Sequence, residues 1–286
     1  MTDNEIFDLE PDGAPNRFRL RIDSGLCVGM PGHRIMFGGV GIGASVAALS
    51  RALGRDPIWA TAHFLSVAKE GACLQLEVET LHASRNVAQA RLTARMGDNV
   101  AFMVSAAAGA YQSDMSRQWR VAPDVPPPED TPVLEGFDAA RDDFHSRLET
   151  RRIKGHWGIQ NFDKSDMRDD GHALFWVWRR DGGPVTPAMV AMTADYVPGA
   201  AGPALGVMAG ANSLDLTLRL MNHRHETDWV LVELQMDAAG CGILQGGARL
   251  YARDGVLLGT STQTGAIRIV RPGSTSEGQL RAEGAG

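Results

Sequence analysis

Alternating apolar and polar positions predict β-strands over much of the chain. The clearest case is residues 74–79, Leu-Gln-Leu-Glu-Val-Glu, where every second residue is apolar. A period of two is typical of a strand that buries one face. Other runs of strand length predict further strands at residues 18–22, 58–67, 87–95, 100–108, 151–162, 173–179, 214–220, 229–236, 242–253 and 256–268. Gly97-Asp-Asn99 predicts a hairpin turn between two of them.

Two stretches predict helices. A glycine-dense turn leads into a run of small residues at 40–53, and Gly54 stands where a left-handed helix stop costs least. Small residues on most faces let other elements approach closely, so we expect a curved sheet to surround this helix. A second helix is predicted to begin with Thr186 as N-cap and Pro187 in its first turn, and to run through Tyr196.

The two halves of the chain resemble one another. Residues 74–79 have the same pattern as residues 232–237, and Ala90–Arg95 nearly repeats as Ala248–Arg253, both at an offset of 158 positions. Alternating strands always look somewhat alike, but the shared offset and the near-identical six-residue segment favour an internal duplication. One helix followed by antiparallel strands, occurring twice, predicts an α+β fold built from two copies of one unit.

Composition and charge narrow the class of protein. The 286 residues carry a net charge of −6 without a basic patch, which argues against nucleic acid as a partner. Three widely spaced cysteines without a Cys-x-x-Cys motif fit a reducing compartment and predict no disulfide or metal framework. The acidic lead, residues 1–16, lacks the pattern of a signal peptide, and no apolar run reaches membrane-spanning length. We therefore expect a cytoplasmic protein that does not contact a membrane.

Three short motifs resemble a dinucleotide-binding site, a nucleophile elbow and a metal site, but each is weak evidence for that function. Gly39-Val-Gly-Ile-Gly-Ala44 resembles a dinucleotide fingerprint, but the chain does not alternate strand and helix as that fold requires. Gly43-Ala-Ser-Val-Ala47 lacks the closing glycine of a nucleophile elbow. His223-Arg-His225, with Glu226 and Asp228, fits an exposed hairpin loop better than a metal site. We expect neither a cofactor nor a metal.

Several motifs together resemble the acyl-CoA thioesterase II family of double-hotdog hydrolases. They are Phe37-Gly-Gly39, His63-Phe-Leu65, Ala90–Arg95, Thr193-Ala-Asp-Tyr196, Ser213-Leu-Asp215, and Ser261-Thr-Gln-Thr-Gly265 followed by Ile267-Arg268. Their order and spacing are more specific than any one of them. The resemblance spans residues 31–108 and 173–268, and it implies two antiparallel sheets, each wrapped around a central helix.

The resemblance also implies a catalytic set. It places a carboxylate on Asp195, a hydroxyl on Ser213 and a carboxamide on Gln263, which jointly hold a water molecule. A carboxylate is a suitable base for that water when burial raises its pKa. All three lie in the second half, and the first half offers no matching Asp or Gln. We expect the second half to be catalytic and the first to complete the pocket.

Each of these residues also has a structural interpretation. Asp195 fits a solvated position near a helix end, although the helix dipole disfavours an anion there. Ser213 fits an ordinary loop serine just before a strand, and Gln263 fits an exposed edge strand. Gly38 and Gly39 are candidate oxyanion donors because their N–H groups open a helix. The strand after Ser213 lacks the His and aromatic residues usual in the family, which affects the shape of the expected pocket.

From the pattern and the resemblance we divide the chain into four parts. These are an N-terminal hotdog at 16–110, a linker or covering segment at 111–148, a C-terminal catalytic hotdog at 149–270 and a flexible tail at 271–286. The segment Ala122-Pro-Asp-Val-Pro-Pro-Pro-Glu-Asp-Thr-Pro132 cannot continue a helix or a central strand. The pattern does not decide between helix and irregular loop for residues 137–149, and we expect a disordered lead before residue 16.

The predicted function is hydrolysis of an acyl-CoA thioester to the free acid and CoA. The alternative is a protein on the same fold that binds acyl-CoA or an acyl-carrier thioester without hydrolysis. The presence of all three polar residues favours the enzyme. Because hotdog sheets often pair edge to edge, we also expect a homodimer or homotetramer.

Overall fold

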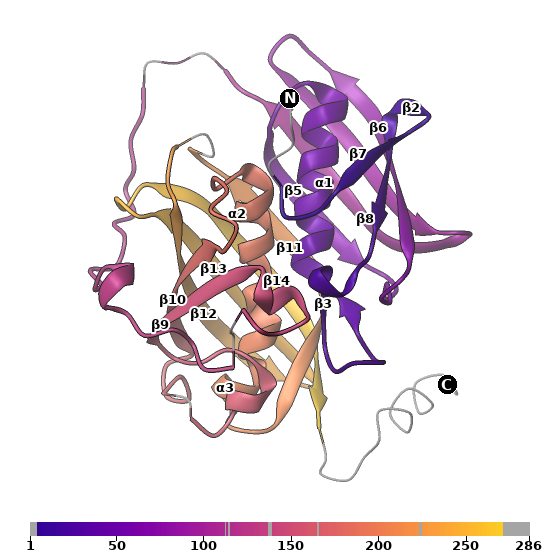
Figure 1. Ribbon diagram of the computed structural model, residues 1–286. Helices are drawn as coiled ribbons and strands as arrows, with labels where there is room; N and C mark the ends of the chain where they lie inside the picture. The colour runs from indigo at the N-terminus through magenta and orange to yellow at the C-terminus, as the bar shows by residue number, and fades with distance from the viewer. Residues whose placement is uncertain are drawn as a thin grey trace.

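The structure, a computed structural model, shows one large antiparallel sheet that curves around two adjacent helices (Figure 1). It describes residues 5–270 apart from 112, 114, 137–138, 165 and 223–224. The tail predicted at 271–286 lies outside the described residues. Among the described helices, none is long and apolar enough to cross a membrane.

The first half contains nine of the regular elements. They are β1 (Leu9–Asp12), β2 (Ala14–Arg21), β3 (Cys27–Val28), β4 (Ile35–Met36), α1 (Gly38–Leu53), β5 (Pro57–Phe64), β6 (Cys73–Ala83), β7 (Val87–Met96) and β8 (Asn99–Gly109). The second half contains β9 (Leu148–Lys154), β10 (His172–Arg179), α2 (Pro187–Thr193), α3 (Ala201–Leu205), β11 (Ala209–Leu220), β12 (Trp229–Gly240), β13 (Ile243–Ala252) and β14 (Leu257–Ile269). Short 3₁₀ turns lie between them, including η3 (Phe144–Ser146), η4 (Ile159–Asn161) and η5 (Ala194–Ala200).

The strand order shows the duplication directly. It reads β1-β2-β6-β7-β8-β5 and then β11-β14-β13-β12-β10-β9, so the second half runs through its strands in the reverse spatial order. The halves join where β5 pairs antiparallel with β11, and at that junction Thr61 lies opposite Thr217 with their hydroxyls 3.2 Å apart. The predicted α+β double hotdog is confirmed, with its two sheets fused into one of twelve strands.

The repeat offset predicted from the sequence is wrong by two residues. The β6–β7 ladder has a bulge after Thr80, opposite Ala90, and the β12–β13 ladder has the matching bulge after Met236, opposite Gly246. These pairs correspond at an offset of 156, which is also the separation of Thr61 and Thr217. A shift of two leaves an alternating pattern unchanged, so periodicity alone cannot detect the error.

Helix α1 is surrounded as its small residues predict. Every residue from Gly39 to Leu49 is buried, and Gly54 ends the helix in the left-handed region. Gly43 lets α2 approach, because a Cβ there would lie 2.6 Å from Met192 Cγ. Helix α2 begins as predicted, with Thr186 Oγ1 accepting the Met189 N–H at 3.1 Å.

Two segments differ from their predictions. The lead before residue 16 is ordered from residue 5 onward: β1 pairs with β2, and Ile6, Phe7 and Leu9 are buried in the core. The lead is polar overall, so its composition does not indicate that these three apolar residues are buried. The strand predicted at 151–162 ends at Lys154, because the chain turns through glycines with positive φ at 155 and 158.

Segment 115–136 runs over the outer face of the second half. Ala122 and Val125 pack against an apolar cluster that includes Trp176 and Tyr251, and the Trp176 indole N–H donates to the Pro126 carbonyl at 2.9 Å. The corresponding face of β6 is polar and exposed at Gln75, Glu77 and Glu79. Within 137–149 the described residues form η3 and the start of β9, and Phe137 lies outside the described residues.

Candidate active site

Asp195 stands at a break in the second helical segment. The α-helix ends at Thr193, and Asp195 has non-helical backbone angles (φ −91°, ψ 33°) inside η5. The prediction of a helix through Tyr196 is therefore wrong. Pro198 has no N–H to continue the α-helical ladder to Ala194, whose carbonyl accepts a hydrogen bond from Ser261 Oγ at 3.2 Å. At this break the Asp195 side chain points toward Gly38 of the first half and lines the cavity between the halves.

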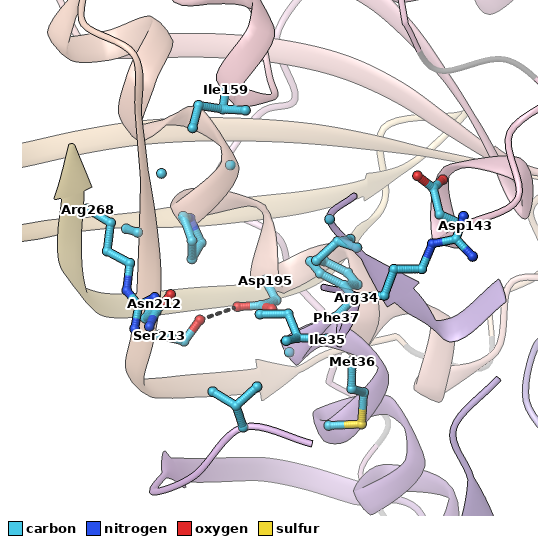
Figure 2. A pocket seen from close by; sticks show the side chains of 18 of the residues that line it. Arg34, Ile35, Met36, Phe37, Asp143, Ile159, Asp195, Asn212, Ser213 and Arg268 are labelled. Carbon is cyan, nitrogen blue, oxygen red and sulfur yellow. Dashed lines mark hydrogen bonds between the residues drawn. The ribbon is translucent and has the colours of Figure 1, made fainter. Parts of the chain in front are cut away.

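Asp195, Ser213 and Gln263, the polar trio, lie in direct contact. Ser213 Oγ donates to Asp195 Oδ1 at 3.1 Å, as the dashed line in Figure 2 shows. Gln263 Nε2 donates to the same carboxylate oxygen and to Ser213 Oγ, the latter at 2.9 Å. The structure thus brings together three side chains that are far apart in the sequence.

Two of the structural interpretations do not hold. Gln263 is 2% exposed and lies on β14, an interior strand between β11 and β13, so it is not on an edge strand. Ser213 lies inside β11, at a bulge where the register shifts between Ser213 and Asp215, and not in a loop before the strand. A bulge re-aims the side chain next to it, which here directs the hydroxyl toward Asp195.

Burial dominates the electrostatics of Asp195. The side chain is 2% exposed, and burial raises its pKa from 3.8 to about 7 against the opposing hydrogen bonds from Gln263, Ser213 and the Gly39 N–H. The interpretation of Asp195 as a solvated carboxylate is wrong. A carboxyl group with a pKa near 7 exchanges its proton at neutral pH, which is the property of a general base or acid.

The N-terminus of α1 meets the carboxylate. The first N–H groups of a helix have no intrahelical partner and carry partial positive charge, and that of Gly39 donates to Asp195. A Cβ on Gly38 would lie 2.5 Å from Asp195 Oδ2, and one on Gly39 would lie 2.5 Å from the Met192 carbonyl oxygen. The glycine pair therefore permits this close approach. The Gly39 N–H is engaged by the carboxylate, whereas Gly38 lines the adjoining cavity.

A cavity of about 1020 Å³ opens beside the trio, between the two halves. Gly38, Asp195 and Ser213 line it, and the last two are labelled in Figure 2. Asn212 and Arg268 line it from the second half, and the Asn212 amide oxygen, oriented to satisfy both groups, accepts two guanidinium hydrogen bonds at 2.7 and 2.9 Å. The volume suits a drug-sized organic molecule rather than a metal ion.

A second set of charges lines the cavity on the side of the first half and is paired internally. Arg34 Nη1 lies 3.1 Å from Asp142 Oδ2, and Arg141 holds Asp143 through both carboxylate oxygens. Burial alone would raise the pKa of Asp143, but the hydrogen bonds from Arg141 and the His145 backbone, together with the neighbouring positive charges, outweigh it and lower the pKa. Burial lowers the pKa of His145 to about 4, so this side chain is neutral at pH 7.

Sequence reasoning missed an aromatic cluster behind the trio. The Trp157 indole packs 5.0 Å from the Tyr196 ring and donates its N–H to the Tyr196 carbonyl at 2.6 Å, while Phe37 contacts both rings edge-on. A Cβ on Gly199 would lie 2.1 Å from Trp157 Cε2, so that glycine is needed for the packing. The available signal was the glycine spacing around Trp157, which marks a turn and not a continuous strand.

The histidine motif does not form a metal cluster among the described residues. His223 and Arg224 lie outside them, and His225 Nε2 lies 2.8 Å from Asp254 Oδ2 on the neighbouring hairpin. Throughout the described part of the chain, no three His, Cys, Asp or Glu side chains come close enough to hold a metal ion.

Comparison with known proteins agrees with this architecture. The family models described as the acyl-CoA thioesterase N-terminal and C-terminal domains match residues 28–109 and 122–267. A candidate thioesterase of Novosphingobium aromaticivorans is 28% identical, with 90% of this chain and 97% of that chain aligned at a TM-score of 0.80. A hot dog protein of unknown function from Alicyclobacillus acidocaldarius is 22% identical, over 93% and 96% of the two chains, at a TM-score of 0.77.

A third solved structure is the acyl-CoA thioesterase II TesB2 of Mycobacterium marinum. It is 19% identical, covers 92% of this chain and 96% of its own, and has a TM-score of 0.68. No curated protein sequence matches the chain. Because one family model alone matches more than half of the residues and the other covers the first half, the chain belongs to the acyl-CoA thioesterase family.

Proposed function

We propose that this protein hydrolyses an acyl-CoA to the free acid and CoA, with Asp195 as the base that activates water. The observation that carries the proposal is the buried carboxylate, with a pKa of about 7, that contacts Ser213 and Gln263 at the wall of an organic-sized cavity. Membership of the thioesterase family supports the reaction class.

The mechanism follows from the donors and acceptors of the trio. Ser213 and Gln263 hold the Asp195 carboxylate through neutral groups, which leaves the carboxylate as the only anion of the trio. Gln263 Oε1 is buried and has no hydrogen-bond partner within the described structure, so it offers an acceptor for one hydrogen of a water molecule. Asp195 accepts the other proton as the water oxygen attacks the thioester carbonyl carbon.

The rest of the cycle balances without a further reactant. Attack converts the carbonyl into a tetrahedral oxyanion, and the Gly38 N–H at the positive end of α1 is the donor that we assign to it. Collapse re-forms the carbonyl and breaks the carbon–sulfur bond. Protonated Asp195 then returns its proton to the CoA thiolate, which regenerates the base.

Thiol release from a panel of acyl-CoAs tests the proposal. Asp195→Asn keeps the size of the side chain and removes the base, so turnover should fall by roughly 10²- to 10⁴-fold. Asp215→Asn is the matched control, because Asp215 lies on β11 near Ser213 and accepts the Thr264 N–H at 3.1 Å without joining the trio. Undiminished turnover in Asp195→Asn would rule out this carboxylate as the base.

The alternative, binding of a thioester without hydrolysis, predicts a different outcome. The wild type would bind acyl-CoA in calorimetry, and no member of the panel would release thiol. The homodimer or homotetramer stays a prediction, which sedimentation velocity would test.

A further inference from the structure

The part of the cavity lined by Met36, Phe64 and Phe102, here called the first-half branch, lies beside the start of α1. Gly38, at the start of the helix, abuts the Asp195 carboxylate. Gly41 lies three residues further, on a neighbouring part of the helix surface and about 4.5 Å along the axis. Met36, Phe64 and Phe102 line the cavity in this direction, and Phe102 is 1% exposed, which places it at the inner end.

Met36 and Phe102 rest directly on Gly41. A Cβ at that position would lie 3.1 Å from Met36 Cε and 3.2 Å from Phe102 Cε1. The ring of Phe64 packs against Phe102 with 6.2 Å between centroids. Together these apolar side chains close the space between α1 and the sheet at a point one helical turn beyond Asp195.

We propose that the first-half branch binds the acyl group, and that Met36 and Phe102 form its end wall and set the upper limit on the size of that group. The inference rests on the proposed function. The acyl chain extends from the thioester carbonyl at Asp195 along α1, past Gly38, until it meets the two side chains at Gly41. An apolar wall accepts a hydrocarbon chain and offers no partner to a charged end group.

The opposite side of the cavity suits the rest of the substrate. In Figure 2, Met36 and Arg268 are drawn on opposite sides of Asp195. Asn212 and Arg268 there present amide and guanidinium groups, which match the amides and phosphates of CoA. This arrangement fixes the direction of the substrate, with its acyl end in the first half and its CoA end toward the second.

Two substitutions change the end wall in opposite senses. Met36→Ala shortens a half-buried side chain and lengthens the branch, whereas Gly41→Ala pushes Met36 and Phe102 into it. The measurement is kcat/KM for butyryl-, hexanoyl-, octanoyl- and dodecanoyl-CoA. Met36→Ala should raise the ratio of long-chain to short-chain kcat/KM by about tenfold, and Gly41→Ala should lower it by about tenfold.

Matched controls separate size selection from general damage. Met103→Ala removes the same side chain from the residue next to Phe102, on the other face of β8 and outside the cavity lining. Gly240→Ala adds a methyl group where nothing lies within 4 Å. Both should keep the wild-type chain-length profile.

The outcomes distinguish the two proposals. An active wild type whose chain-length profile is the same in Met36→Ala and Phe102→Leu would overturn the end wall while leaving the proposed function intact. If Gly41→Ala does not fold, these two variants still decide the matter. A wild type that releases no thiol from any acyl-CoA would overturn the proposed function, and calorimetric binding of the same panel to Met36→Ala would then test the wall by itself.

Discussion

The two halves share one topology, yet the polar trio occurs in only one of them. The bulge that holds Ser213 on β11 matches a bulge on β5 between Pro57 and Trp59, so Pro57 is the counterpart of Ser213. Gln263 lies opposite Leu216, and its counterpart Ala106 lies opposite Ala60. The backbone positions are preserved while the side chains that would carry the chemistry are not.

The helices differ in the same sense. Helix α1 runs unbroken for 16 residues and presents uncapped glycine N–H groups at its start. Helix α2 has 7 residues, is capped by its own Thr186 side chain and breaks just before Asp195. One half therefore contributes a regular helix with an open N-terminus, and the other contributes the carboxylate that this terminus meets. The proposed site needs the N-terminus of α1 and the break after α2.

Of the substitutions considered in this comparison, Gly38→Ala should disturb the contact between the start of α1 and the Asp195 carboxylate most. The added Cβ, placed 2.5 Å from Asp195 Oδ2, must displace the carboxylate. A misplacement of about 1 Å costs on the order of 100-fold in kcat. Gly240→Ala adds a methyl group outside the cavity lining, where nothing lies within 4 Å, and should have little effect on thiol release. Equal losses in the two variants would show that the contact between the halves at Gly38 is not the cause.

Gln263→Ala makes the second half resemble the first, where Ala106 stands. The substitution removes a hydrogen bond to the ionised carboxylate and one to Ser213, and kcat should fall by about 10- to 100-fold. Gln245→Ala, on the adjacent strand β13 and exposed, is the control for loss of a carboxamide. Full activity in Gln263→Ala would mean that the difference at this position between the halves has no functional meaning.

The pH dependence of kcat/KM should follow Asp195. Only the ionised carboxylate accepts a proton, so the rate should rise about tenfold per pH unit below pH 7 and level off above it. Ser213→Ala removes one hydrogen bond that lowers this pKa and should move the midpoint to higher pH. A midpoint near 4 in the wild type would instead indicate a solvated carboxylate.

The free energy of unfolding should also depend on pH through Asp195, with a smaller effect than that on the rate. The pKa of Asp195 is about 7 in the folded protein against 3.8 for an unperturbed Asp, so between these values the folded state binds the extra proton. The free energy of unfolding contributed by this group is therefore highest below pH 4 and declines as the pH rises to about 7. Asp195→Asn removes this decline. The change in Tm caused by the substitution should therefore be more positive at pH 8 than at pH 5, by several degrees. An equal Tm change at both pH values would contradict the assignment.

The sequence predicts the strands and the helix starts because those depend on local periodicity and capping. Thr186 caps α2, and the Gly97 turn joins β7 to β8, as their residue types require. The offset of the repeat is not predictable in the same way, since an alternating pattern is unchanged by a shift of two. The order of the lead also escapes prediction, because it depends on distant partners for Ile6 and Leu9.

At the site, the residue types were predictable and their setting was not. The resemblance to the family points to Asp195, Ser213 and Gln263, and in the structure these side chains are in contact. The break at Asp195 has two causes. Pro198 has no N–H for the Ala194 carbonyl, and that carbonyl instead accepts a hydrogen bond from Ser261, which is distant in the sequence. The engagement of the Gly39 N–H by Asp195 depends on how closely the second half approaches α1, which no local pattern encodes.

The two halves, joined where Thr61 pairs with Thr217, belong to one chain, and this affects how their sequences can evolve. In a dimer of identical chains, every substitution appears on both sides of the symmetry axis, so a proline at the site of the serine would destroy both sites at once. Here one continuous gene encodes both sides, and a mutation at Pro57 leaves Ser213 untouched. Fusion across this strand pair lets the two copies diverge: under the proposed mechanism, the second copy keeps the reaction while the first is free to change its side chains around the substrate.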